Sequence, residues 1–503
     1  MKKLLSVILA ITLLLTAFSA FAENTESTTP GEAPAGFDGG TPPEPPEGFD
    51  GSTPPEPPEG FDGSNPPGEP PEGFGGGNPP DGAPGGFGGG TPPGAQSADI
   101  TYTAAYEING DSSARTESNE TYTSSSADEN ALLITQAGVT LDNPTVSKTG
   151  DSNGGDSCNF YGLNAAVLIK DGADVVITGG TVESSASGAN GVFVYGGNGA
   201  MNGGAGDGTT LHISDTTITT TGDGSGGIMT TGGGVTYAEN LTVTTSGRSS
   251  APIRTDRGGG TVVVDGGTYT SNGLGSPAIY STADITVKNA TLVSNLSEGV
   301  CIEGMNSITL ENCDMTANNT QCNSNATFLD TIMIYQSMSG DADSGTSAFT
   351  MTGGSLTSLS GHMFHVTNTH AVITLSGVNL VNEGSDVLLS VCDDGWNGAS
   401  NTAELVADAQ ALSGTILVGD NSTLTLTLRN GSAFEGCVSG EIVNAKGTQV
   451  STEVGTVNVA LDETSTWTLT ADTYVTSFSG SAANVISNGY TLYVNGVALA
   501  GTN

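Results

Sequence analysis

The chain has 503 residues, with 53 Asp and Glu against 11 Lys and Arg, and a formal net charge of −42. So acidic a protein repels nucleic acids and anionic membrane surfaces, which excludes both as expected partners. Gly accounts for 75 residues, aromatic residues make up 6%, and no long segment shows the apolar periodicity of an amphipathic helix, so a mostly helical fold is excluded as well.

Residues 1–22 have the features of a secretory signal peptide. Two lysines precede an apolar stretch at residues 4–16, and Ala20-Phe21-Ala22 forms a small-x-small cleavage site. We therefore expect an exported protein, secreted or associated with the cell surface, with no membrane insertion after cleavage. Export permits disulfides, but the pairing of the six cysteines cannot be deduced from their spacing.

Residues 23–98 are a Pro/Gly-rich, low-complexity segment. A twelve-residue unit runs from Pro42 to Thr53 and returns with one change from Pro54 to Asn65. Because each unit has one large apolar residue, a Phe, no core can form, and the composition predicts a disordered, semi-flexible spacer. Docking of the periodic Phe residues to a partner is the alternative interpretation.

From about residue 99 the composition shifts towards Thr, Val, Ile and Ser. Residues 99–140 are typical of short strands and are expected to cap the first coil of a repeat array, since the open end of such an array exposes apolar edges. Residues 461–503 are again rich in strand-forming and aromatic residues, and we expect them to form the C-terminal coil and cap.

Residues 141–460 contain a repeated phrase in which an apolar residue is followed five positions later by another. Successive copies in the clearest stretch begin 23 to 26 residues apart. The clear copies span Leu141–Val146, Ile177–Val182, Ile213–Ile218, Ala238–Val243, Val264–Tyr269, Val287–Leu292, Leu310–Met315, Met351–Leu356 and Leu375–Leu380. A period in this range indicates a solenoid of stacked units.

Each repeat also contains a second apolar segment, such as Val192–Val194 or Val300–Ile302. Short strands at this spacing predict an all-β fold, a right-handed parallel β-helix solenoid of about twelve coils, since crossovers between parallel strands are right-handed. The coils resemble those of pectate-lyase-like β-helices, and resemble more closely those of adhesin-like β-helix proteins secreted by Gram-positive bacteria. The runs Arg254–Gly260 and Ser337–Asp343 are similar to signature stretches of that family. The resemblance implies a surface or secreted binding role.

The outward positions of the second segment are the candidate ligand-binding residues. Alternation places the isoleucines of this segment inward and their neighbours outward, in one column along the solenoid. The candidates in this column are Tyr195, Arg254, Tyr280, Tyr335 and His365. Two more are added for other reasons: Arg257, because it belongs to a cluster of basic residues with Arg254, and Trp396, because it follows the paired carboxylates Asp393 and Asp394 and forms either a sugar subsite or the cap of a turn. Aromatic rings and guanidinium groups in a row could stack on and hydrogen-bond to a polysaccharide. Alternatively, these residues simply decorate an exposed sheet, and the arginines pair with acids such as Asp256.

Two further patterns concern metals. Asp341 and Asp343 resemble the opening of a calcium loop, although the third acid and the downstream Glu are missing, so calcium is the only cofactor that the sequence suggests. His362 and His365 are three positions apart, and on a regular strand they would face opposite sides and could not share a metal.

Catalysis is the runner-up interpretation. In galacturonan hydrolases on this fold an Asp-Asp pair precedes a Gly-His-Gly motif, whereas here Gly361-His362 precedes Asp393-Asp394. Arg254 with Asp256 could imitate part of a pectate lyase site. A shared fold is weak evidence for a shared reaction. We therefore expect a monomeric, non-catalytic adhesin-like protein that binds a polysaccharide or surface glycan, with a polysaccharide lyase or glycoside hydrolase, or a structural surface-layer component, as alternatives.

Overall fold

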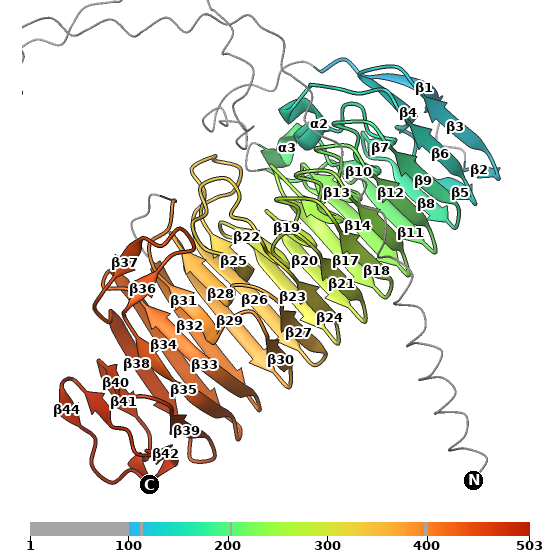
Figure 1. Ribbon diagram of the computed structural model, residues 1–503. Coiled ribbons are helices and arrows are strands. Elements are labelled where there is room, and N and C mark those ends of the chain that lie inside the picture. The colour runs from blue at the N-terminus through green and yellow to red at the C-terminus, as the bar shows by residue number, and fades with distance from the viewer. Residues whose placement is uncertain (1–99, 111–113, 202–203, 397–400) are drawn as a thin grey trace, which may run out of the picture. The chain divides into compact units, whose positions relative to one another are not determined.

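The structure is a computed structural model that describes residues 100–110, 114–201, 204–396 and 401–503. The signal peptide and the Pro/Gly-rich spacer that the sequence predicts lie outside the described residues. The described chain is almost entirely β, and most of its strands join three long parallel sheets, which we name A, B and C (Figure 1). The parallel β-helix predicted from the repeat is confirmed.

As far as β32 (Asn401–Asp408) the chain visits sheets A, B and C in turn, so that neighbours in one sheet are three strands apart in sequence, and beyond the end of sheet C it alternates between sheets A and B. Sheet A consists of β1 (Thr103–Ile108), β4 (Glu129–Ile134), β7 (Val167–Lys170), β10 (Val192–Tyr195), β13 (Ile228–Thr231), β16 (Ile253–Thr255), β19 (Ile279–Ser281), β22 (Val300–Glu303), β25 (Asp330–Tyr335), β28 (His362–Thr367), β31 (Val387–Val391), β33 (Ala411–Val418), β35 (Ala433–Ser439), β39 (Thr466–Leu469) and β42 (Val485–Ile486). Sheet B consists of β2 (Arg115–Ser118), β5 (Val139–Asp142), β8 (Asp174–Thr178), β11 (Thr210–Ser214), β14 (Gly234–Glu239), β17 (Gly260–Asp265), β20 (Asp284–Lys288), β23 (Ser307–Glu311), β26 (Thr346–Thr352), β29 (His370–Ser376), β32 (Asn401–Asp408), β34 (Ser422–Arg429), β38 (Thr456–Leu461) and β41 (Ser477–Ser479). Sheet C consists of β3 (Thr121–Ser124), β6 (Thr145–Lys148), β9 (Thr181–Ser184), β12 (Thr217–Thr220), β15 (Thr242–Thr245), β18 (Thr268–Ser271), β21 (Thr291–Ser294), β24 (Asp314–Ala317), β27 (Ser355–Ser358) and β30 (Asn379–Asn382).

The repeated phrase is the corner between sheets B and C. Its first apolar residue lies in a strand of sheet B and its second in the next strand of sheet C, as with Val264 and Tyr269, which are both 0% exposed. The third residue of the phrase has a positive φ and is Asn, Asp or Gly in every clear copy: Asn143, Gly179, Asp215, Asn240, Gly266, Asn289, Asn312, Gly353 and Gly377. These residue types tolerate the left-handed conformation, which bends the chain from one sheet into the next.

The core lies between the three sheets and is built from columns of inward apolar side chains. Ile177, Ile213, Ala238, Val264 and Val287 follow one another in register along sheet B and are all buried. Burial of each large aliphatic side chain contributes roughly 1.5–3 kcal/mol, so the free energy of folding accumulates coil by coil.

Both ends of the array use the same sheets. β1, β2 and β3 form the first coil, and near the C-terminus β39 and β42 continue sheet A while β41 continues sheet B. Sheet C ends at β30. A separate small sheet of β40 (Thr473–Val475), β43 (Leu492–Val494) and β44 (Val497–Ala498) follows, with a short 3-10 helix, η1 (Ala482–Asn484).

Sheet A differs from sheets B and C because insertions cover its outer face. Two short helices, α2 (Asp156–Tyr161) and α3 (Asn198–Met201), and an antiparallel hairpin, β36 (Ile442–Val443) with β37 (Gln449–Ser451), lie on the same long side of the solenoid (Figure 1). They and the loops around them bury three small apolar clusters against sheet A, outside the central core. No helix in the described part of the chain is long and apolar enough to cross a membrane.

Candidate functional site

The sequence-predicted binding residues lie on the outer side of sheet A, in two columns rather than one. Met229, Arg254, Tyr280, Cys301, Met333 and His365 are in register in the first column. Tyr195 and Tyr335 stand two positions further along their strands, in a second column that also contains Glu303. The outward direction of these side chains was predicted correctly, but their assignment to one column was wrong.

The prediction that this face is open is also wrong, because the insertions bury it. The exposed fractions are 5% for Tyr195, 6% for Arg254, 8% for Tyr280, 6% for Tyr335, 0% for His365 and 9% for Trp396. Arg257 keeps a partly exposed side chain, at 20%. A polymer lying along the solenoid cannot reach rings and guanidinium groups that are packed beneath α2 and the loops.

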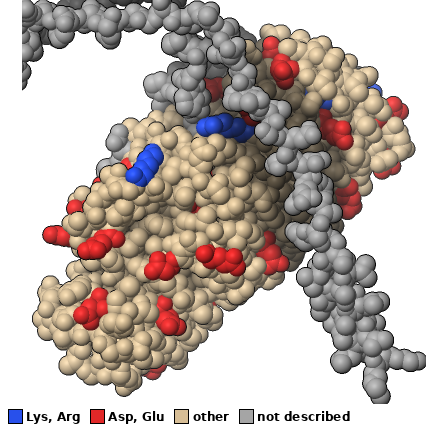
Figure 2. Space-filling model, in the orientation of Figure 1, with Lys and Arg blue, Asp and Glu red and all other residues tan. Residues whose placement is uncertain are grey.

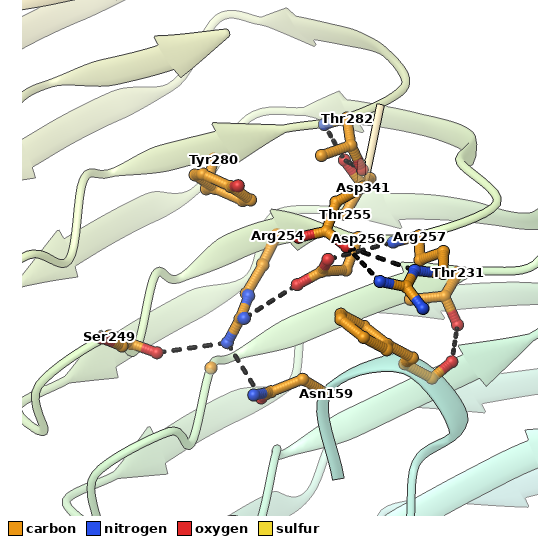
Figure 3. A network of polar contacts seen from close by, with 12 residues as sticks. Asn159, Thr231, Ser249, Arg254, Thr255, Asp256, Arg257, Tyr280, Thr282 and Asp341 are labelled. Carbon is orange, nitrogen blue, oxygen red and sulfur yellow. Dashed lines mark hydrogen bonds and ion pairs between the residues drawn. The ribbon is translucent and has the colours of Figure 1, made fainter. Parts of the chain in front are cut away.

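Arg254 and Asp256 form a buried ion pair that holds α2 on the solenoid (Figure 3). The Arg254 Nη2 donates to Asp256 Oδ2 at 2.8 Å, and its Nη1 donates to the Asn159 side chain in α2 at 3.2 Å and to the Ser249 carbonyl at 3.1 Å. Burial raises the pKa of Asp256 to about 7, and the charge of Arg254 limits the rise. These three hydrogen bonds tie Arg254 to Asp256, to α2 and to the segment before β16, so the pair serves as a structural clasp.

Arg257 extends the clasp to the insertion that carries the proposed calcium residues. Its Nε and Nη2 both donate to Asp341 Oδ1, at 3.2 and 2.6 Å, and its guanidinium lies 4.4 Å from the centre of the Phe160 ring in α2. Figure 3 shows Arg257 and Asp341 beside the Arg254–Asp256 pair. Asp341 thus pairs with an arginine and Asp343 is exposed, and the described residues contain no group of three or more His, Cys, Asp or Glu that could hold a metal ion. The calcium site remains a prediction without support from this geometry.

A second buried network surrounds Glu303. Its carboxylate accepts hydrogen bonds from Tyr280 and Tyr335 at 2.6 and 3.1 Å, and from the hydroxyls of Ser337 and Ser339 in the same insertion as Asp341. The Tyr335 ring packs on Trp396, with ring centres 4.8 Å apart. The cavity beside these rings has a volume of about 30 Å³, which is room for roughly one water molecule and not for a sugar.

His365 is held by neighbours from three segments. Its Nδ1 lies 2.8 Å from Ser390 Oγ, its Nε2 lies 3.3 Å from the buried Asp394 carboxylate, and its ring packs on Phe328. Burial would raise the pKa of Asp394, but the neighbouring His365 and the hydrogen bonds that Thr327 and the Gly395 N–H donate lower it instead. Asp394 therefore joins the covering loops to β28.

The prediction that His362 and His365 face opposite sides is wrong. The Nδ1 atoms of both rings lie 2.8 Å from Ser390 Oγ. Met363 and Phe364 between them are both in the central core, so the strand loses its regular alternation there. Burial and the neighbouring His365 lower the pKa of His362 to about 3, which keeps its ring neutral.

The open face of sheet B carries a groove of about 250 Å³ that the sequence-based candidates do not include. One wall consists of Val176, His212, Tyr237 and Val263, which occupy one outward column of β8, β11, β14 and β17. The opposite wall consists of Ser214, Glu239 and Asp265 in the next outward column. The groove therefore runs along the solenoid axis, with an apolar wall and an acidic wall.

The apolar wall of this groove is accessible and ordered. The His212 and Tyr237 rings are stacked, with centres 4.7 Å apart and planes at 14°, and Tyr237 is 41% exposed. A signal for these residues exists in the sequence: the alternation in Thr210-Leu-His-Ile-Ser214 and Val235-Thr-Tyr-Ala-Glu239 directs the ring-bearing residues outward. Only the tertiary structure shows that nothing among the described residues covers this column while sheet A is covered.

Comparison of the chain with protein-family models, with curated proteins and with solved structures finds no match. It is therefore the arrangement of the side chains that points to a function.

Proposed function

We propose that this protein is an exported, non-catalytic, adhesin-like glycan-binding protein, and that its ligand lies along the groove on sheet B. The observation that carries the proposal is the accessible pair of His212 and Tyr237 opposite Glu239 and Asp265. The resemblance of the coils to adhesin-like secreted β-helices and the predicted signal peptide support the same role.

The two walls of the groove match the two kinds of surface that a sugar ring presents. The C–H groups of a pyranose pack against apolar and aromatic side chains such as Val176 and Tyr237. Its hydroxyls donate to carboxylates, and hydrogen bonds to a charged acceptor are stronger than neutral ones. The wall residues come from four consecutive strands, which at about 4.8 Å per interval span roughly 14 Å, so the groove suits an extended chain rather than a single sugar.

The negative charge of the molecule favours a neutral polysaccharide over an anionic one as the ligand. The net charge is −42, and Figure 2 shows acidic side chains spread along the visible face with few basic ones. An anionic polymer would be repelled by this field and by Glu239 and Asp265 in the groove itself. The affinity for a neutral glycan is not lowered by this repulsion.

Affinity electrophoresis or pull-down on a panel of neutral polysaccharides tests the proposal. Tyr237→Ala removes the ring from the groove and is expected to abolish retention, whereas Tyr490→Ala is the matched control, since Tyr490 is 42% exposed and lies far from the groove in sequence. Equal retention of both variants would contradict the assignment to sheet B, and a wild-type chain retained by no neutral glycan would contradict the function.

A hydrolase is the second candidate, because Glu239 and Asp265 are neighbours in register on adjacent strands. Pairs of carboxylates are the catalytic groups of most glycosidases. The same incubations should therefore be assayed for new reducing ends. If the wild-type protein forms product and Glu239→Gln or Asp265→Asn does not, the protein is a hydrolase rather than a non-catalytic binding protein. A lyase using Arg254 is disfavoured by the burial of that side chain. A structural surface-layer component would instead self-assemble and show no retention.

A further inference from the structure

The outer face of sheet C carries a regular array of threonines that the proposed function does not use. We define the threonine face as the outward positions of β12, β15, β18 and β21. Its members are Thr217, Thr219, Thr242, Thr244, Thr268, Thr270, Thr291 and Val293. All of these side chains are exposed or half-buried, and the single exception to threonine, Val293, has the same branched shape.

The array has two fixed repeats. The outward residues form two columns in which each residue is the direct partner of the next, with no register shift. The first column is Thr217, Thr242, Thr268 and Thr291, and the second is Thr219, Thr244, Thr270 and Val293. Neighbouring strands lie about 4.8 Å apart, and alternate residues on one strand lie about 6.7 Å apart. The hydroxyl and methyl groups therefore form a two-dimensional lattice with these two spacings.

The lattice is held rigidly from below. The residue between each outward pair points into the core, and Ile218, Val243, Tyr269 and Leu292 are all 0% exposed. Branching at Cβ restricts χ1 of threonine and valine, so few orientations are available to the outward groups. The threonine face is thus ordered before any ligand arrives, which lowers the entropy cost of binding.

The threonine face is also free of charge in a strongly acidic protein. None of its eight positions is charged, although Glu183 and Asp314 stand in the same two columns on the adjoining strands β9 and β24. A rigid, neutral lattice of hydroxyls and methyls complements a neutral surface with the same repeats. Ice presents a neutral, regularly repeating lattice of hydrogen-bond donors and acceptors, and apolar groups such as methyls restrict the orientation of the water beside them.

We propose that the threonine face binds ice, by joining its lattice of hydroxyls and ordered water to that of a crystal surface. Adsorbed protein makes the ice front advance in curved segments, which slows growth and recrystallisation. This activity is separate from glycan binding on sheet B, since the two faces share no side chain.

Ice-affinity partition of the full chain provides the test, with ice recrystallisation as a second readout. The wild-type protein is expected to be incorporated into slowly growing ice and to keep crystals small. Thr244→Lys places a long charged side chain at the centre of the threonine face. We expect it to reduce incorporation into ice to the background level of a protein that does not bind ice. Thr309→Lys, a half-buried outward threonine at the middle of β23 in sheet B, is the matched control and should behave as wild type.

Circular dichroism and the melting temperature verify that both variants fold. Exclusion of the wild-type protein from ice would overturn the proposal. So would equal incorporation of the wild-type, Thr244→Lys and Thr309→Lys proteins, because adsorption would then occur on another face. Loss of polysaccharide retention in Thr244→Lys, with no ice binding by the wild type, would assign sheet C to a glycan instead.

Discussion

At the scale of single residues, the clasp on sheet A shows how one environment changes the role of an arginine. Arg254 has the residue type and the outward direction expected of a ligand-binding group, yet its side chain is only 7% exposed and lies against Asp256, Asn159 and Ser249. A buried ion pair adds little over an apolar replacement, but loss of one partner leaves the other uncompensated.

Arg254→Ala is therefore expected to lower the free energy of unfolding by about 3–5 kcal/mol, as measured by chemical denaturation, because Asp256 stays buried without its partner. Arg429→Ala is the control, because Arg429 makes a similar pair with Asp408 but has a side chain that is 49% exposed, and its loss should cost about 1 kcal/mol or less. Equal losses in both variants would show that the covering of Arg254 contributes nothing.

Asp330 is a buried acid whose protonation should make stability depend on pH. Burial, followed by the charges of Glu298 and Asp394, raises its pKa well above the usual value of 3.8, and its Oδ1 has no hydrogen-bond partner among the described residues. The folded protein then holds a proton that the unfolded chain releases above about pH 4. This group accordingly destabilises the fold as pH rises from the unfolded pKa towards the folded one.

Asp330→Asn removes the ionisable group and keeps its shape. Relative to wild type, the variant should gain stability as pH rises above 4, by up to about 1.4 kcal/mol for each pH unit, with little difference at pH 4. Denaturation at a series of pH values measures the difference. Parallel stability curves for the two proteins would mean that Asp330 is already ionised in the folded state.

At the scale of elements, the corner between sheets B and C is the unit that the sequence repeats. Two buried apolar residues fix its ends, and one residue with a positive φ turns the chain between them, as with Val264, Gly266 and Tyr269. Each corner packs on the corners of the coils before and after it, so a fault in one is transmitted to its neighbours.

Val264→Asp is expected to abolish folding or secretion, because it places a carboxylate between two coils with no partner. Val443→Asp, at a position that is 52% exposed in the β36–β37 hairpin, is the matched control and should express normally. Expression yield and melting temperature report the outcome, and a normal Val264→Asp protein would contradict the register of sheet B.

At the scale of the whole molecule, the three sheets have three different outer faces. Sheet A is covered by insertions that come from several coils and are tied down by Arg254, Glu303 and Asp394. Sheet B has a groove with an apolar and an acidic wall. Sheet C is short-stranded and carries the neutral threonine face. The outer faces of a β-helix can carry different binding sites, because substitutions on one face leave the columns of the core unchanged.

The sequence by itself determined the fold, since the spacing of inward apolar residues and the turn-forming Asn, Asp and Gly are local properties that recur from coil to coil. It also determined, through alternation along the strands, that Arg254, Tyr280 and Tyr335 point outward from sheet A, although alternation fails in β28 between His362 and His365. Only the tertiary structure decided which of those side chains reach solvent. Insertions as distant in sequence as α2 and the loop with Asp341 meet above sheet A, and such contacts leave no periodic signal in the chain. The groove at His212 and Tyr237 is open for the same reason: its accessibility depends on where the insertions fold, and they fold over sheet A.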